Sequence, residues 1–380
     1  MKKQFLVAPG PTPVPELARL AMAESLLHHR GPEFKAIFAE VRDLLKWVFQ
    51  TENEVLSLTC SGTGAFEAGM VNFTKRADTI IAIGGGKFGE RWSSVGNAYG
   101  MNVVDIETPW GKQVDVNQLE SALKRHPDAA MVTVSISETS TGVLHPLAEI
   151  AELTRNHGRA FARGRRHHRG RGASHADGRA WDRCARLRLA EGVFDTPGLA
   201  FLAASERAWA RYKEGDHPRY YFDLERERKN HLKDQTAFTP AISLIVGLRV
   251  VLRMMKDEGL ENVFARHAKL AQATRSAVQA IGLGVFAEVP ANSVTAVSVP
   301  EGISAPKLVS YMRNDGVTIA GGQDQLKDST IRIGHLGYFD PSDIAVALAS
   351  LERALHAQGQ AVTFGAAIGA MQRSLLGVST

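Results

Sequence analysis

The strongest constraint on the fold is a repeated alternation of short apolar runs and helical patterns in the first half of the chain. Four runs rich in β-branched residues each end in a turn with glycine or serine, and an amphipathic stretch then follows. These runs are 55–59, 79–83, 103–106 and 131–135. The alternation is typical of a mostly parallel sheet covered by helices on both faces, so we predict an α/β domain. A helix over 34–48 is predicted to cap its core.

The C-terminal part of the chain follows a different order of patterns. Two long helical stretches, 240–256 and 260–281, precede a strand-helix-strand-helix succession that runs from 294 to 356. This predicts a smaller α+β domain. We place the large domain at 15–255 and the small domain at 1–14 together with 256–357. Residues 358–380 are rich in glycine and alanine and are expected to form a weak helix or a tail, with no assigned role.

Composition excludes several other classes of protein. The chain has 380 residues, 44% of them hydrophobic and 22% charged, which is a globular composition rather than that of a disordered or collagenous chain. Its two cysteines, Cys60 and Cys184, are too few for an iron–sulfur cluster, a metal cage or a disulfide framework. Without a signal-peptide pattern or a long apolar run, we expect a cytoplasmic protein with no membrane partner.

The positive charge of the chain comes from one segment. The formal net charge is +5, yet residues 159–188 contain ten arginines and two acids and so contribute +8. The remaining 35 basic and 38 acidic residues sum to −3. A basic protein ordinarily suggests a nucleic-acid or membrane partner, but here the basic character belongs to about thirty residues.

Three of the turns that follow predicted strands carry polar or small residues. They are Ser61–Ala65, Gly84–Trp92 and Ser137–Gly142. Each one alone is typical of a tight or capped turn, and an isolated Phe88 is typical of a core residue. Ligands of open α/β sheets bind at the carboxyl ends of strands, where helix N-termini favour phosphate. Together the three turns predict one pocket with phosphate-binding, stacking and hydrogen-bonding groups.

Nine collinear motifs give the chain a specific resemblance. They are APGPTPVP (8–15), HHRGPEF (28–34), SGTGAFEA (61–68), GGKFGERW (85–92), ETSTGVLHP (138–146), PGLAF (197–201), PRYYFDL (218–224), TAFTPAISL (236–244) and IRIGHLG (331–337). In these motifs the chain resembles the class V aminotransferases, and among them most closely the alanine–glyoxylate, serine–glyoxylate and serine–pyruvate enzymes. The resemblance implies fold type I, with a large domain around a mostly parallel sheet and a smaller C-terminal α+β domain, and pyridoxal 5′-phosphate as cofactor.

The resemblance also implies roles for residues of the large domain. Thr63, Gly64 and Ala65 would hold the cofactor phosphate through backbone N–H groups and a hydroxyl. Phe88 would stack on the pyridine ring, and Thr139 would hydrogen-bond the ring hydroxyl.

Further implied roles concern the subunit interface and the substrate. Thr239 and Thr236 would reach the phosphate of the neighbouring subunit, because sites of this family are completed across the interface of a homodimer. Arg332 would hold the substrate carboxylate with its bidentate guanidinium. Outside the IRIGHLG motif, a surface ion pair would be the preferred interpretation of Arg332.

Two residues that the family needs are missing from their expected places. One is a lysine that binds the cofactor covalently, and the other is an aspartate at the pyridine nitrogen. Between Lys124 and Lys213 the chain contains no lysine. The arginine-rich segment stands there instead, and we expect it to lack the buried central strands of the family, because ten arginines are costly to bury in a sheet.

The arginine-rich segment reads as family sequence in another frame. Displaced by one base, the codons of 184–193 can encode VLVSGSQKAF, those of 162–168 LVDAVTT, and those of 181–184 GIDV. The lysine then falls at Glu191 and the aspartate at Gly164. We infer two compensating frameshifts, one near 158–161 and one near 195–197. The chain as printed is therefore predicted to lack aminotransferase activity.

Three functional hypotheses follow. The leading one is transamination of a small amino acid, alanine or serine, with glyoxylate or pyruvate by the native gene product. A cysteine desulfurase shares the fold but needs a mobile catalytic cysteine, and neither Cys60 nor Cys184 is suited to that role. An inactive scaffold that binds nucleic acid through its arginines is disfavoured, because the segment interrupts a sheet and has few aromatic residues.

Overall fold

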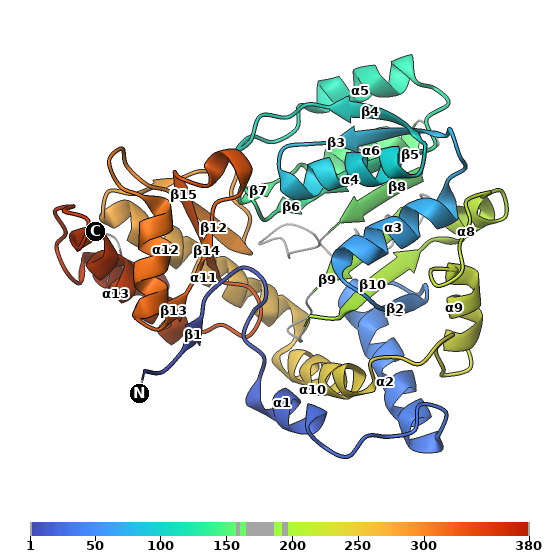
Figure 1. Cartoon of the computed structure of the whole chain (residues 1–380), viewed down its shortest axis with the longest axis horizontal. Helices are drawn as coiled ribbons and strands as arrows, with labels where there is room; N and C mark the ends of the chain where they lie inside the picture. Colours follow the sequence, from blue (N-terminus) through green and yellow to red (C-terminus); the bar gives the residue numbers. More distant parts are fainter. Residues whose placement is uncertain (1, 157–159, 165–185, 192–196, 379–380) are drawn as a thin grey trace.

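The computed structural model describes residues 2–156, 160–164, 186–191 and 197–378. Two units lie side by side, one built around a large sheet and one around a small sheet, and both chain termini lie on the side of the small sheet (Figure 1). No helix in the described residues is long and apolar enough to cross a membrane.

The large sheet has seven strands within the described residues, in the order β2-β10-β9-β8-β5-β3-β4. All neighbours are parallel except at β10, which is antiparallel to both β2 and β9. The strands are β2 (Val55–Thr59), β3 (Thr79–Ile83), β4 (Asn102–Ile106), β5 (Met131–Ser135), β8 (Ala160–Gly164), β9 (Arg186–Glu191) and β10 (Leu199–Ala204).

Helices cover both faces of this sheet, because successive side chains of a buried strand point to opposite faces. Ile80 packs in the core beneath α3, α4 and α8, whereas its neighbour Ile81 packs in the core beneath α5 and α6. Helices α2 and α10 cover the same face as α5 and α6, over β2 and β10. The helices are α1 (Glu16–Met22), α2 (Pro32–Phe49), α3 (Gly62–Phe73), α4 (Lys87–Ala98), α5 (Val116–Arg125), α6 (Leu147–Asn156), α8 (Glu206–Tyr212), α9 (Leu224–His231) and α10 (Ile242–Glu258).

The small unit is a four-stranded sheet, β11-β12-β15-β14, with helices packed against it. Its strands are β11 (Gly284–Val285), β12 (Val294–Ser298), β14 (Ala320–Gly321) and β15 (Thr330–Gly334), and its helices are α11 (Leu260–Ala280), α12 (Ala305–Asn314), α13 (Pro341–His356) and α14 (Ala366–Leu376). A short 3₁₀ turn spans Asp324–Leu326.

Two short pairings tie distant parts of the chain together. Strand β1 (Phe5–Leu6) is parallel to β13 (Val317–Thr318), so the N-terminal segment lies with the small unit. Strands β6 (Ser137–Glu138) and β7 (Val143–Leu144) form a hairpin just after β5. Within 358–380 the helical alternative is confirmed, because α14 forms there and places Ala367 and Met371 in the core of the small unit. The domain boundaries proposed above remain predictions.

One structural expectation about the arginine-rich segment is wrong. We expected no strand there, but the structure has β8 and β9 in the centre of the large sheet, between β5 and β10. The reason is that each residue carries a backbone donor and acceptor whatever its side chain, and two strands inside a covered sheet need hydrogen-bonded neighbours. The rest of the segment, including Cys184, lies outside the described residues.

Candidate active site at the carboxyl edge of the sheet

The candidate positions gather at one edge of the large sheet. Thr59 ends β2, Ser135 ends β5, Gly164 ends β8 and Glu191 ends β9. Gly164 lies opposite Ser135 in the neighbouring strand. On β10, Leu199 pairs with Thr59 and the next residue, Ala200, pairs with Glu191. The two positions inferred from the shifted reading frame therefore end neighbouring strands, at the edge where the phosphate-binding turn begins.

The start of α3 forms the predicted phosphate turn. Its N-cap, Ser61, makes no side-chain capping hydrogen bond, while its carbonyl accepts the N–H groups of Gly64 at 2.9 Å and Ala65 at 3.3 Å. A Cβ atom added at Gly64 would lie 2.8 Å from Cys60 Cβ, so the turn is too tight for any larger residue. An uncapped helix N-terminus with such close backbone packing suits an anion.

The start of α4 presents Phe88 and is held by a carboxylate that the sequence analysis missed. Glu138 is fully buried, and it accepts hydrogen bonds from the N–H groups of Phe88 at 3.1 Å and Gly89 at 2.8 Å, and from the N–H and hydroxyl of Ser140. Burial raises the pKa of this carboxyl group, while its hydrogen bonds oppose the rise. The signal that could have found it is an acid within a run of hydroxyl residues after a buried strand.

Thr139 and Arg332 connect the two sheets. Arg332, on β15, donates from Nη1 to the Thr139 carbonyl at 3.0 Å and from Nε to the Gly321 carbonyl at 2.8 Å. Its exposed fraction is 8% and that of Thr139 is 1%. The alternative interpretation of Arg332 as a surface residue is therefore wrong, because the guanidinium is buried where the small unit meets the carboxyl edge of the large sheet.

The two threonines of the 236–239 loop differ in their surroundings. Thr236 is buried, and its hydroxyl donates to the Phe238 carbonyl at 2.6 Å, whereas Thr239 is exposed. Both line a cavity of about 20 Å³ beside Ser57 and Thr59 of β2. The geometry therefore favours Thr239 as the hydroxyl that could reach another subunit, and its role remains a prediction.

A partly buried charged cluster, also missed by the sequence analysis, supports this loop. Glu227 of α9 accepts the Ala237 N–H with both carboxylate oxygens, at 3.2 Å each, and lies 3.2 Å from His231 Nε2. Arg42 of α2 binds Glu54 through two hydrogen bonds and also pairs with Asp234. The cluster fixes both ends of the segment that leads to Thr239.

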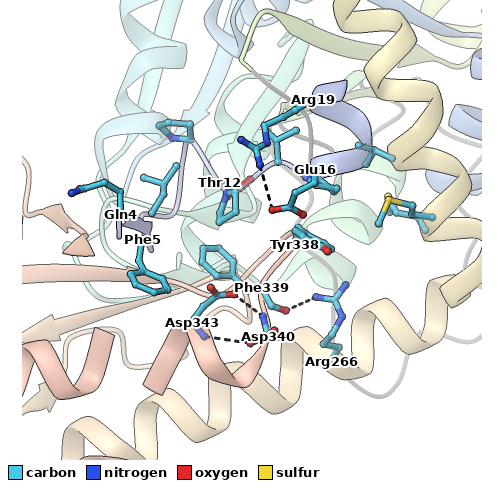
Figure 2. A pocket seen from close by; sticks show the side chains of 18 of the residues that line it. Gln4, Phe5, Thr12, Glu16, Arg19, Arg266, Tyr338, Phe339, Asp340 and Asp343 are labelled. Carbon is cyan, nitrogen blue, oxygen red and sulfur yellow. Dashed lines mark hydrogen bonds and ion pairs between the residues drawn. The ribbon is translucent and has the colours of Figure 1, made fainter. Parts of the chain in front are cut away.

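A groove of about 890 Å³ lies away from these residues, between the N-terminal segment, α1, α10 and the loop before α13 (Figure 2). None of the predicted site residues lines it. Two ion pairs lie in its lining, Arg19 with Glu16 and Arg266 with Glu258, and Arg266 also donates to the Phe339 carbonyl. We therefore place the candidate site at the sheet edge and not in this groove.

Comparisons with known proteins agree with the motifs. The profile of the family "Aminotransferase class-V" matches residues 17–162. The chain is 42% identical over 356 residues to a protein of Anabaena cylindrica named soluble hydrogenase 42 kDa subunit, with 92% of each chain covered. The chain belongs to the class V aminotransferase family.

Two further relatives carry names that describe enzymes of this family. The serine–glyoxylate aminotransferase of Methylorubrum extorquens is 31% identical, with 97% of this chain and 95% of that protein covered. The structure of pyridoxamine–pyruvate aminotransferase from Mesorhizobium loti superposes with a TM-score of 0.91 at 25% identity, covering 99% of this chain and 98% of that one. Class V aminotransferases are pyridoxal-phosphate-dependent enzymes of fold type I, as predicted.

The residues present fit the cofactor in part. The uncapped start of α3, the tight cradle at Gly64 and the anchored Phe88 suit a phosphate and a planar ring. Gly164 and Glu191 do not fit, because glycine offers no carboxylate to a ring nitrogen and a glutamate cannot bind an aldehyde covalently as an amine does. The start of α3 and Phe88 therefore suit the expected binding roles, whereas Gly164 and Glu191 lack the groups that their expected roles need.

Proposed function

We propose that the native product of this gene transfers the amino group of a small amino acid, alanine or serine, to glyoxylate or pyruvate. The convergence of three groups at one sheet edge carries the proposal: the α3 start, Phe88 of α4, and Thr139 bound to Arg332. The names of relatives that act on glyoxylate and pyruvate support the choice of acceptor.

The residues of this chain divide the binding task. Thr63, Gly64 and Ala65 hold the phosphate, Phe88 stacks on the ring, and Thr139 contacts the ring hydroxyl. Arg332 orients the substrate carboxylate, and its contact with the Thr139 carbonyl keeps that carboxylate close to the ring. When bound, the cofactor supplies an electron sink for the bonds at the substrate Cα.

We further propose a homodimer in which Thr239 completes the phosphate site of the other subunit. The exposure of Thr239 and the rigid support of its loop by Glu227 favour this arrangement. Buried on the same loop, Thr236 acts by holding the turn through the Phe238 carbonyl.

The chain as printed is proposed to be inactive because its lysine and aspartate were lost to the frameshift. Two observations support this. The family profile stops at residue 162, close to where the shift is inferred to begin, whereas full-length relatives align on both sides of the segment. Gly164 and Glu191 also end adjacent strands at the active edge, which is where a cofactor-binding aspartate and lysine would be useful.

The test begins with the nucleotide sequence of codons 155–200. The printed chain and a frame-restored version are then assayed with an amino-acid panel, using glyoxylate and pyruvate as acceptors. We expect the printed chain to be slower by several powers of ten, the scale on which loss of a covalent catalytic residue acts. Borohydride reduction followed by peptide mass spectrometry should find the cofactor attached only to the restored chain. Covalent cofactor and activity in protein whose mass matches the printed sequence would contradict the proposal.

A further inference from the structure

Arg91 contacts both halves of the predicted cofactor-binding surface. It lies one helical turn after Phe88 on α4, so the two side chains share a face of that helix. Its Nη1 donates to Thr63 Oγ1 at 2.9 Å, and its guanidinium carbon lies 4.7 Å from the centroid of the Phe88 ring. No role was assigned to Arg91 by the motifs.

The packing around Arg91 fixes this geometry. The next residue, Trp92, is buried and stacks on Phe66 of α3, with ring centroids 4.0 Å apart and an angle of 5° between the planes. This stack locks the starts of α3 and α4 against each other. The preceding residue, Glu90, accepts a hydrogen bond from Trp110 Nε1 at 2.8 Å, so that acid is engaged on another side of the helix.

A hydroxyl oxygen that accepts a hydrogen bond still has its own proton to donate. When Thr63 Oγ1 accepts from Arg91, the hydroxyl proton is directed to a different acceptor. A nearby guanidinium charge also favours an anion at the start of α3, where the helix dipole already favours one.

We infer that Arg91 is a positioning residue, which orients the Thr63 hydroxyl so that it donates to the phosphate of the cofactor. This inference rests on the proposed function, because it takes Thr63 as a phosphate ligand. Arg91 acts through Thr63, while its contact with Phe88 fixes the plane of the guanidinium.

The experiment measures how tightly the printed full-length chain binds two ligands. Pyridoxamine 5′-phosphate needs no lysine for binding, and pyridoxamine lacks the phosphate. The variants are Arg91→Gln, Arg91→Lys, Thr63→Ala and the double variant Arg91→Gln/Thr63→Ala. Arg125→Gln is the matched control, because Arg125 is exposed on α5. Circular dichroism and melting temperature establish that each variant is folded.

Arg91→Gln should weaken binding of the phosphorylated ligand about tenfold or more, the scale of one charge-assisted hydrogen bond, and change pyridoxamine binding little. Arg91→Lys should retain only part of the affinity for the phosphorylated ligand, since lysine lacks the planar guanidinium group of arginine. In the Thr63→Ala background the effect of Arg91→Gln should nearly vanish, because the coupled pair is already broken.

Three results would overturn the inference about Arg91 alone. They are additive effects of Arg91→Gln and Thr63→Ala on affinity, full affinity in the Arg91→Lys variant, or an equal loss of affinity for pyridoxamine 5′-phosphate and pyridoxamine in the Arg91→Gln variant. In each of these cases the parent chain still prefers the phosphorylated ligand and Thr63→Ala still weakens it, so the proposed cofactor site survives. If the parent chain has no preference for the phosphate form, the proposed site and the inference fail together.

Discussion

At the scale of single residues, three buried histidines show that surroundings rather than residue type set the charge of a side chain. His335 donates from Nδ1 to the Asn292 carbonyl and accepts from the Thr295 hydroxyl with Nε2, His267 accepts the Gly337 N–H, and His145 accepts the Val114 N–H. Burial lowers the pKa to about 3 for His335 and to about 4 for His267 and His145. All three are therefore neutral at physiological pH.

These histidines predict a loss of stability in mild acid. The unfolded chain takes up a proton at each of them below pH 6.5, whereas the folded chain does not until about pH 4 or lower. The histidine contribution to stability is thus present above pH 6.5 and is lost as pH falls toward 4. Between pH 7 and pH 5 each buried histidine should lower the free energy of unfolding by about 2 kcal/mol.

Urea unfolding at pH 7, 6 and 5 measures this loss. His335→Asn, which keeps a short polar side chain that cannot be protonated, should flatten the pH dependence even if it lowers stability at pH 7. His356→Gln is the control at an exposed histidine and should leave the slope unchanged. The same slope in the His335→Asn variant as in the parent would contradict the assignment.

At the scale of elements, backbone hydrogen bonding to neighbouring strands places two strands that their side chains alone did not predict. Strands β8 and β9 lie in the centre of the sheet although they contain arginines, which are costly to bury, because β5 and β10 need partners on both sides. The starts of α3 and α4 depend instead on particular residues. A glycine permits the close approach at one, and a buried carboxylate satisfies the N–H groups at the other.

Two helical glycines, Gly64 at the start of α3 and Gly369 in α14, should respond differently to substitution by alanine. Gly64→Ala should destabilise the protein by about 1–3 kcal/mol, because the new Cβ would lie 2.8 Å from Cys60 Cβ. Gly369→Ala in α14 should be neutral or stabilise by up to about 1 kcal/mol, because its Cβ would meet only the end of the Arg373 side chain at 3.3 Å. Chemical denaturation of both variants tests the pair. A Gly64→Ala variant as stable as the parent would show that the turn can relax.

At the scale of the whole molecule, the net charge depends on one segment. The body of the protein carries −3 and the arginine-rich segment +8. The restored reading of that segment is largely apolar with few charges, as suits strands buried between two layers of helices. Under the proposed frameshift, the basic character belongs to the shifted segment and does not indicate a partner.

Isoelectric focusing provides the test of this charge argument. The printed chain should focus as a basic protein and the frame-restored chain near or below neutrality. The printed chain should also be retained more strongly on a cation-exchange column at low salt, with the difference vanishing as salt rises. Equal isoelectric points for the two chains would contradict the assignment of charge to the segment.

The sequence by itself determined the fold class, most strands and helices of both units, and the turns that carry the predicted cofactor-binding residues. These features are local, because periodicity and turn residues are written in short stretches of chain. The proposed positions of the missing lysine and aspartate, Glu191 and Gly164, were also inferred from sequence alone, by the shifted reading frame, and they stay predictions.

Only the tertiary structure decided which of these residues work together. The Arg332 contact with Thr139, the role of Glu138 behind Phe88, and the contact of Arg91 with Thr63 join residues 28 to 193 positions apart. Such contacts depend on which strands are neighbours and on how two helices pack, and no local pattern records either. For the same reason β8 and β9 could not be predicted, because their neighbours in the sheet, rather than their own side chains, place them there.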